Sequence, residues 1–320
     1  LGLPLGIELA AVLTQYQSCA DIVQALTANY DALTASWHDL PSRHQSLQAV
    51  FEYSWQRLSA EEALTLAQCS VFLGGFAATA VQAVTGVPFA RLAALAQKSL
   101  LRPLGNGRFD MHELIRHFAA EKLAHLQTDD NPVQAGHCAY FVDFLHQRQD
   151  RLENETAVLR EIQTDINNIR AAWQWAVLQQ QTAALDKAVT GLSRFYRLVG
   201  FYREALDTFA QAISSLEKAP PARPILFLLG QLYAEQSYFV GRIVNLNEAL
   251  LLAQKTLRIG QELNDTYLQT VGHGHIAAIL IDHLNVFRDN RAGAVQDDRE
   301  SGQTLFSFFQ DIEAQLWLGA

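Results

Sequence analysis

Apolar residues recur at helical spacing along most of the chain, and short polar or glycine-containing breaks separate these stretches. In one stretch Leu47, Val50, Phe51, Ser54 and Trp55 fall at positions i, i+3, i+4, i+7 and i+8, which places them on one face of a helix. Ala and Leu, both strong helix formers, dominate the composition. The pattern therefore predicts a mainly α protein.

Residues 42–127 have the pattern of a small winged-helix-like domain. Ser59, with Glu62 three residues later, forms a capping box that predicts a helix start. Two short apolar runs flank the Gly-Asn-Gly sequence at 105–107, which is the strongest hairpin signal in the chain. Helical spacing resumes at His112. Three helices, a hairpin and a further helix follow one another within this segment.

Helical repeats are predicted over residues 186–320, after connecting helices over 128–185. The sequence around Ala205 recurs loosely around Ala249, 44 residues later, and a third, weaker copy lies near Ala292–Ala294. Small residues at one helix crossing and large ones at the next allow helix pairs to stack, as in a solenoid of tetratricopeptide type. The period is longer than the roughly 34 residues usual for that repeat.

Composition and charge narrow the class of protein. Hydrophobic residues make up 49% and charged residues 18% of the 320 residues, which is typical of a globular chain. The net charge of -9 argues against a nucleic-acid-binding face. No apolar run approaches the ~20 residues that span a bilayer. Cys19, Cys69 and Cys138 lie in apolar helical contexts and are predicted to be buried, reduced thiols of a cytoplasmic protein.

The candidate motifs for catalysis or metal binding fail on spacing. His112 and His117 resemble a zinc-protease pair but are five residues apart, so that they lie ~140° apart around a helix. His273 and His275 lie in a glycine-broken stretch with no carboxylate or Cys at ligand spacing. The sequence has no G-x-S-x-G, C-x-x-C or phosphate-binding G-x-x-x-x-G-K-[ST] motif. We expect no metal site, and no enzymatic activity from this chain alone.

Two features remain as candidate ligand contacts. Gly2 and Pro4 form a turn that leads into a helix, where free backbone N–H groups and a rigid ring suit packing against a nucleotide. His112 stands between the hairpin and a helix, where the helix dipole favours a neutral imidazole that can donate to an anion. From these residues alone, a simple helix-initiating turn and a capping surface histidine remain open alternatives.

Taken in order, these segments resemble a known family. GLPLGIELAA (2–11) resembles the G-L-P-L segment of NB-ARC modules in STAND-class signal-transduction ATPases. Residues 42–76 and 98–123 resemble the start and end of the winged-helix domain in bacterial members, with Met-His-Glu at 111–113 in place of Met-His-Asp. Many such proteins are LuxR-type, MalT-like or SARP-type transcriptional regulators in which tetratricopeptide repeats follow.

The resemblance implies nucleotide contacts in an intact parent protein. Gly2 and Pro4 would lie against bound ADP or ATP, and His112 would contact the β-phosphate of ADP. Glu113 in place of Asp puts the local hydrogen bond of that carboxylate in doubt. The P-loop half of such proteins would precede residue 1, so we expect this chain to be a fragment whose residues 1–41 are the C-terminal helical part of the nucleotide module. The isolated chain is expected to bind no cofactor.

The sequence thus predicts a helical-bundle remnant, a winged-helix-like domain with one small β-hairpin, and an α-solenoid. The predicted function is that of a regulatory fragment of a nucleotide-dependent switch, with a protein or small-molecule signal bound on the repeats. We expect no membrane partner and no direct DNA binding, except through a separate domain of the parent. The alternative is a tetratricopeptide scaffold that mediates protein–protein interaction without a switch.

Overall fold

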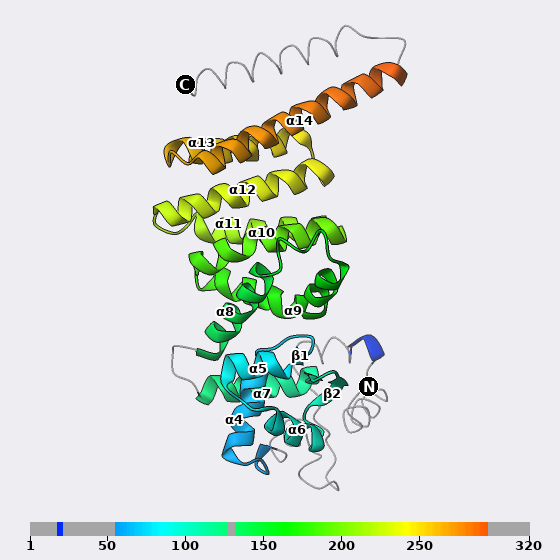
Figure 1. The fold of residues 1–320 in the computed structure, drawn as a ribbon, viewed down its shortest axis with the longest axis vertical. Helices are drawn as coiled ribbons and strands as arrows, with labels where there is room; N and C mark the ends of the chain where they lie inside the picture. Colours follow the sequence, from blue (N-terminus) through cyan, green and yellow to red (C-terminus); the bar gives the residue numbers. More distant parts are fainter. Residues whose placement is uncertain (1–17, 22–54, 127–131, 294–320) are drawn as a thin grey trace. The chain divides into compact units, whose positions relative to one another are not determined.

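The computed structural model describes residues 18–21, 55–126 and 132–293, with side chains described through residue 283. The protein is mainly α with one small antiparallel sheet, which confirms the predicted fold class (Figure 1). Gly2 and Pro4 lie outside the described residues, as does Ala294 of the predicted third repeat copy. The predicted domain boundaries stay predictions. The chain divides into two compact units, Leu1–Gly200 and Phe201–Ala320.

The first unit contains the predicted hairpin. Its first elements are α4 (Ala60–Cys69), β1 (Phe76–Ala77), α5 (Ala78–Thr85), α6 (Phe89–Gln97), β2 (Arg102–Gly105), β3 (Arg108–Asp110) and α7 (Glu113–Leu126). The capping box of Ser59 and Glu62 is confirmed, with both reciprocal hydrogen bonds formed. The hairpin β2–β3 is confirmed as well. The two-residue strand β1, which completes the sheet order β1-β3-β2, was not predicted.

Three longer helices complete the described part of this unit: α8 (Pro132–His146), α9 (Thr156–Leu178) and α10 (Thr182–Val199). An aromatic cluster joins α8 to the segment before β1. Phe72, in that segment, has its ring centroid 5.1 Å from Phe76 and 6.1 Å from Phe141 of α8. All three rings are almost completely buried. The small sheet therefore packs on the same core as α8.

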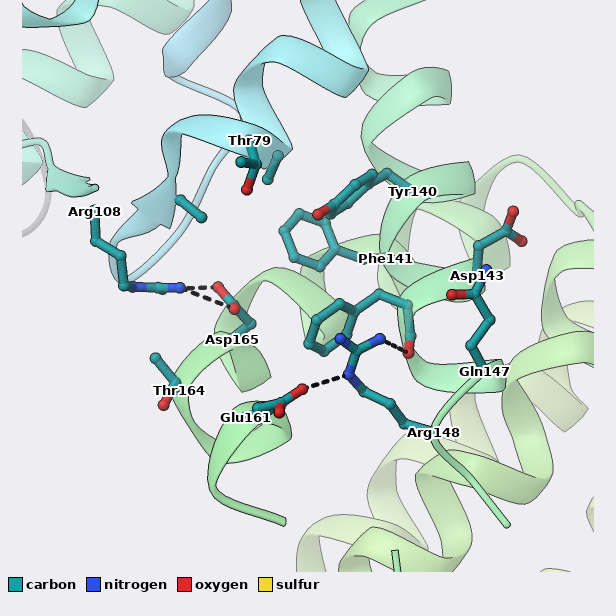
Figure 2. Close-up of a pocket in the computed structure, with 13 residues that line it drawn as sticks. Thr79, Arg108, Tyr140, Phe141, Asp143, Gln147, Arg148, Glu161, Thr164 and Asp165 are labelled. Carbon is teal, nitrogen blue, oxygen red and sulfur yellow. Dashed lines mark hydrogen bonds and ion pairs between the residues drawn. The ribbon is translucent and has the colours of Figure 1, made fainter. Parts of the chain in front are cut away.

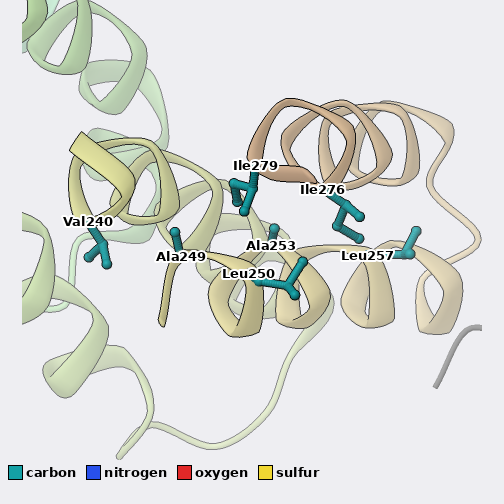
Figure 3. Packing of buried hydrophobic residues seen from close by; sticks show 7 residues of the cluster. All are labelled: Val240, Ala249, Leu250, Ala253, Leu257, Ile276 and Ile279. Carbon is teal, nitrogen blue, oxygen red and sulfur yellow. The ribbon is translucent and has the colours of Figure 1, made fainter. Parts of the chain in front are cut away.

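Up to residue 293, the second unit contains α11 (Tyr202–Leu216), α12 (Arg223–Ile243), α13 (Leu246–Glu262) and α14 (Thr266–Gly293). Each of these helices packs against the next one along the chain. Ala205 and Ala249 both occupy the fourth residue of their helices, and both are completely buried. The two sequence copies therefore have equivalent places in successive helix pairs. Figure 3 shows the apolar cluster in which Ala249, Ala253 and Ile276 pack together.

Two sequence expectations are wrong. Cys69 and Cys138 are buried, and burial raises the pKa of their thiols to about 12 and about 11, but Cys19 is exposed. It follows Ser18, whose hydroxyl and backbone exchange hydrogen bonds with Asp21 in an exposed helical turn. The stretch around Gly274 does not break the helix, because α14 runs through it without interruption.

The glycines of α14 provide a matched test of the helix crossing. A Cβ added at the buried Gly272 would lie 2.9 Å from the backbone of Leu257 in α13, whereas one added at the exposed Gly274 would meet nothing within 4 Å. Gly272→Ala should lower the free energy of unfolding by roughly 1–3 kcal/mol, because α13 must shift. Gly274→Ala should raise it by about 0.5–1 kcal/mol, because Ala is the better helix former.

Urea unfolding of the two variants and the wild type measures both changes. If Gly272→Ala were as stable as Gly274→Ala, the close approach of α13 and α14 would be wrong.

Candidate functional site

A surface cavity of about 480 Å³ lies beside His112. Its walls come from the segment between α6 and β2, the start of β2, the end of β3, the first turn of α7 and the loop before β1. The charged or titratable side chains that line it are Arg102, Asp110, His112, Glu113 and Arg116. The cavity is therefore polar and open to solvent on the side where the sequence predicts a nucleotide contact.

His112 acts as the cap of α7. It directly precedes the helix, and its Nδ1 accepts a hydrogen bond from the backbone N–H of Leu114 at 3.2 Å. Burial of the half-buried ring, the largest cause, lowers the pKa of His112 below its usual value. The neutral ring with an accepting Nδ1 carries its proton on Nε2. The sequence predicts a neutral ring through the helix dipole, whereas burial is its largest cause here, and the nucleotide contact of His112 stays a prediction.

The charges around His112 are balanced in pairs. Arg102 forms an ion pair with Asp110, across the hairpin. The guanidinium of Arg116 bonds to both carboxylate oxygens of Glu113, and this contact is the main reason that the pKa of Glu113 is lowered. Glu113, whose longer side chain left its hydrogen bonding in doubt, therefore bonds to its own helix. An anion in this cavity would depend on His112 and on the start of α7.

The geometry offers no metal centre in residues 18–21, 55–126 and 132–293, where no group of three His, Cys, Asp or Glu side chains could hold an ion. His117, five residues after His112, instead lies with its Nε2 2.9 Å from a carboxylate oxygen of Glu113. Within the same ranges, no single helix is long and apolar enough to cross a membrane. Helices α5 and α6 are long and apolar enough only when they are taken together, and the chain bends by 118° between them.

A second cavity, of about 560 Å³, lies between the small sheet and α8 and α9 (Figure 2). Arg108 of β3 makes a two-pronged ion pair with Asp165 of α9, at 2.8 and 3.0 Å. Arg148 lies 3.7 Å from the ring centroid of Phe144 and donates to Glu161 at 2.8 Å. Both guanidinium groups of this cavity are thus engaged with carboxylates of α9.

Next to this cavity lies a fully buried polar group, Asn168 of α9, which is 0% exposed. Its Oδ1 accepts from the backbone N–H of Leu73 at 2.7 Å and lies 3.4 Å from Nε2 of His137. Its Nδ2 donates to the carbonyl of Gly75 at 2.9 Å and lies 3.4 Å from Asp165 Oδ1. An amide has two donors and two acceptor positions, so all four are used. We call Arg108, His137, Asp165 and Asn168 the α9 polar cluster.

Sequence reasoning missed the α9 polar cluster, although a signal was present. Asp165 and Asn168 share the helix face of Ile162 and Ile169, which are buried. A carboxylate and an amide on the apolar face of an amphipathic helix require buried partners. The sequence shows that such partners must exist, but it does not show that Asp165 meets Arg108, 57 residues upstream, or that Asn168 meets Leu73, 95 residues upstream.

No family model matches the chain. Three curated proteins, one from Mycobacterium bovis and two from strains of Mycobacterium tuberculosis, are each 28% identical over 246 residues. Each bears the name "Putative HTH-type transcriptional regulator". The match covers 68% of this chain and 28% of each relative. The chain therefore spans less than a third of the length of these relatives.

One solved structure is a signal transduction ATPase with numerous domains (STAND) that has a tetratricopeptide repeat sensor, from Pyrococcus horikoshii. It is 17% identical, and the match covers 88% of this chain and 51% of that chain, with a TM-score of 0.28. A TM-score this low does not establish a shared arrangement.

The buried imidazole of His137 should make stability depend on pH. Burial, partly opposed by the contact with Asn168, lowers the pKa of His137 from 6.5 to about 4. Between these two values the unfolded chain binds a proton that the folded chain does not. The free energy of unfolding should therefore fall as the pH drops from 6.5 towards 4, by up to about 1.4 kcal/mol per pH unit.

His137→Gln places a non-titrating amide donor near the position of Nε2 and should make this fall shallower. Urea unfolding at several pH values measures the slope. The difference between variant and wild type isolates His137, because all other titrating groups are common to both. Parallel slopes would show that the ring does not stay neutral in the folded state.

Proposed function

We propose that this chain is the regulatory part of a nucleotide-dependent signalling switch in a transcriptional regulator. In this proposal Gly2, Pro4 and His112 contact ADP in the full-length gene product, and the helical repeats take up a protein or small-molecule signal. The observation that carries the proposal is the state of His112. It caps α7 through Nδ1, which leaves the proton of the neutral ring on Nε2, and the residue lines an open cavity. The regulator names of the mycobacterial relatives support the same class.

The energetic role of His112 follows from that geometry. A hydrogen bond from a neutral ring N–H to a phosphate oxygen is charge-assisted and contributes about 1.5–3 kcal/mol. Such a contact favours the ADP-bound state only if it exists in one state of the switch and not in the other. A single contact of this size changes nucleotide retention about tenfold or more, which suits a switch that a signal must still be able to open.

The pairing of basic side chains supports a role without direct DNA binding. Five basic side chains between α6 and the first turn of α7 each form an ion pair with a carboxylate. The pairs are Arg91–Glu61, Lys98–Glu62, Arg102–Asp110, Arg108–Asp165 and Arg116–Glu113. Binding to a phosphate backbone requires an excess of unneutralised positive charge. DNA recognition would therefore reside in another domain of the full-length gene product.

Substitution of His112 tests the switch contact in the full-length gene product. His112→Ala should release ADP about tenfold faster or more, because the charge-assisted bond is lost. His112→Asn can still cap α7, since Asn is a strong N-cap residue, but it lacks the Nε2 donor. The Asn variant should therefore match the Ala variant in ADP release and the wild type in thermal stability. Displacement of a fluorescent ADP analogue measures release.

His117→Asn, which alters the exposed neighbour of the same helix, serves as the control and should retain ADP like the wild type. An ADP release rate that is the same in all three variants would remove His112 from the mechanism. That result would favour the alternative, a tetratricopeptide scaffold with no switch.

The isolated chain of 320 residues should neither hydrolyse ATP nor bind ADP measurably, because one side-chain donor and a helix start do not form a phosphate-binding loop. Calorimetric titration of ADP into the purified chain checks this. Micromolar binding would mean that the described cavity is a complete site by itself.

A further inference from the structure

Asn168 holds the loop before β1 by bonding to the residues on either side of Gly74. Asn168 accepts from the N–H of Leu73 and donates to the carbonyl of Gly75, so its amide spans Gly74. Gly74 has a φ of +74°, in the left-handed region that favours glycine. A Cβ added there would lie 2.4 Å from the side-chain amide of Asn167. Contacts with α9 therefore hold the position of this loop, and its conformation at residue 74 favours glycine.

Gly74 is also part of the wall of the His112 cavity. The loop that Asn168 holds thus has one face on α9 and lines the cavity with the other. Gly75, the next residue, has a φ of +86°, and a Cβ added there would meet Leu104 of β2 and the carbonyl of Phe109. The loop is packed between α9 and the hairpin, and a displacement of either side must move it.

The second connection runs through β3. Arg108 is the first residue of that strand, and its ion pair with Asp165 is largely shielded from solvent, with exposed side-chain fractions of 19% and 11%. Four residues further along the chain lies His112. Asn168 donates to the same carboxylate at 3.4 Å, so that one helix face contacts both the loop and the strand that flank the cavity.

We propose that Asp165 and Asn168 are positioning residues for His112, through which α9 controls the shape of the His112 cavity. A movement of α9 breaks the contacts to Leu73, Gly75 and Arg108 together, since the two side chains are one turn apart and bonded to each other. The role of this coupling in nucleotide retention rests on the proposed function, but the coupling itself is a property of the described chain.

The test uses the 320-residue chain without nucleotide. In Asn168→Ala, amide hydrogen exchange at residues 73–77 and 108–114 should accelerate about tenfold or more, because the partly buried N–H of Leu73 and the buried carbonyl of Gly75 lose their partner. The His112 ring resonance, assigned by comparison with His112→Asn, should shift as well. Val189→Ala, a buried cavity-forming change on α10, is the control for a general loss of stability.

Three results would overturn the coupling. One is unchanged exchange in both segments of a folded Asn168→Ala chain. Another is an unmoved His112 resonance in that chain. The third is the same pattern of exchange in Val189→Ala.

If Asn168→Ala does not fold, Asp165→Asn takes its place. It preserves the side-chain volume and removes the charge opposite Arg108. Exchange at 108–114 should again accelerate, and combining it with Arg108→Gln should add little, because the two changes remove the same ion pair. Additive acceleration in the double variant would show that Asp165 and Arg108 do not act together.

In the full-length gene product, Asn168→Ala should speed ADP release, and adding it to His112→Ala should give no further change. The two proposals fail separately. If His112→Ala leaves ADP release unchanged, the proposed function is wrong, although the exchange coupling in the isolated chain can still hold. If hydrogen exchange and the His112 resonance are both unchanged by Asn168→Ala in the isolated chain, the coupling is wrong, whatever the rate of ADP release.

Discussion

The buried amide of Asn168 is the interaction on which the arrangement of the first unit depends. From the middle of α9 it bonds to two backbone groups of a glycine-rich loop, the N–H of Leu73 and the carbonyl of Gly75. A buried amide with all four positions used is stable, but one that loses a partner is costly. The small sheet and the longer helices are therefore joined by a contact that is either fully formed or lost. A small displacement of one relative to the other would leave a buried polar group without its partner.

Charge pairing is the second constraint, and it separates two roles that this kind of fold can have. A hairpin beside a helix, with several Arg and Lys residues, could bind either the phosphate backbone of a nucleic acid or a single phosphate group. Here Arg102 and Arg116 are neutralised at the cavity by Asp110 and Glu113. What remains beside the cavity is a neutral imidazole with one donor, which suits a small, reversible contact better than a broad electrostatic one.

The sequence predicts the parts of this structure that depend on residues close together in the chain, and it misses those that depend on residues far apart. The capping box at Ser59 and the turn at 105–107 are local patterns, and both are confirmed. Strand β1 is only two residues long and exists because β3 provides a partner, so periodicity could not reveal it. The α9 polar cluster was missed for the same reason, because polar residues on an apolar face show only that distant partners exist. The nucleotide contact of His112 was a local inference from its place before a helix, and it stays a prediction.

The contact between Leu73 and Asn168 also has a consequence for how the chain is made. The two residues are 95 positions apart, so the ribosome must add almost a hundred residues after the loop before its N–H and carbonyl can leave water. During that interval the strands of the hairpin can pair, since the residues that they join are close in sequence. The loop that forms one wall of the cavity still lacks its partner and remains hydrated. Synthesis itself therefore imposes an order: the His112 cavity takes its final form only after α9 has emerged and docked.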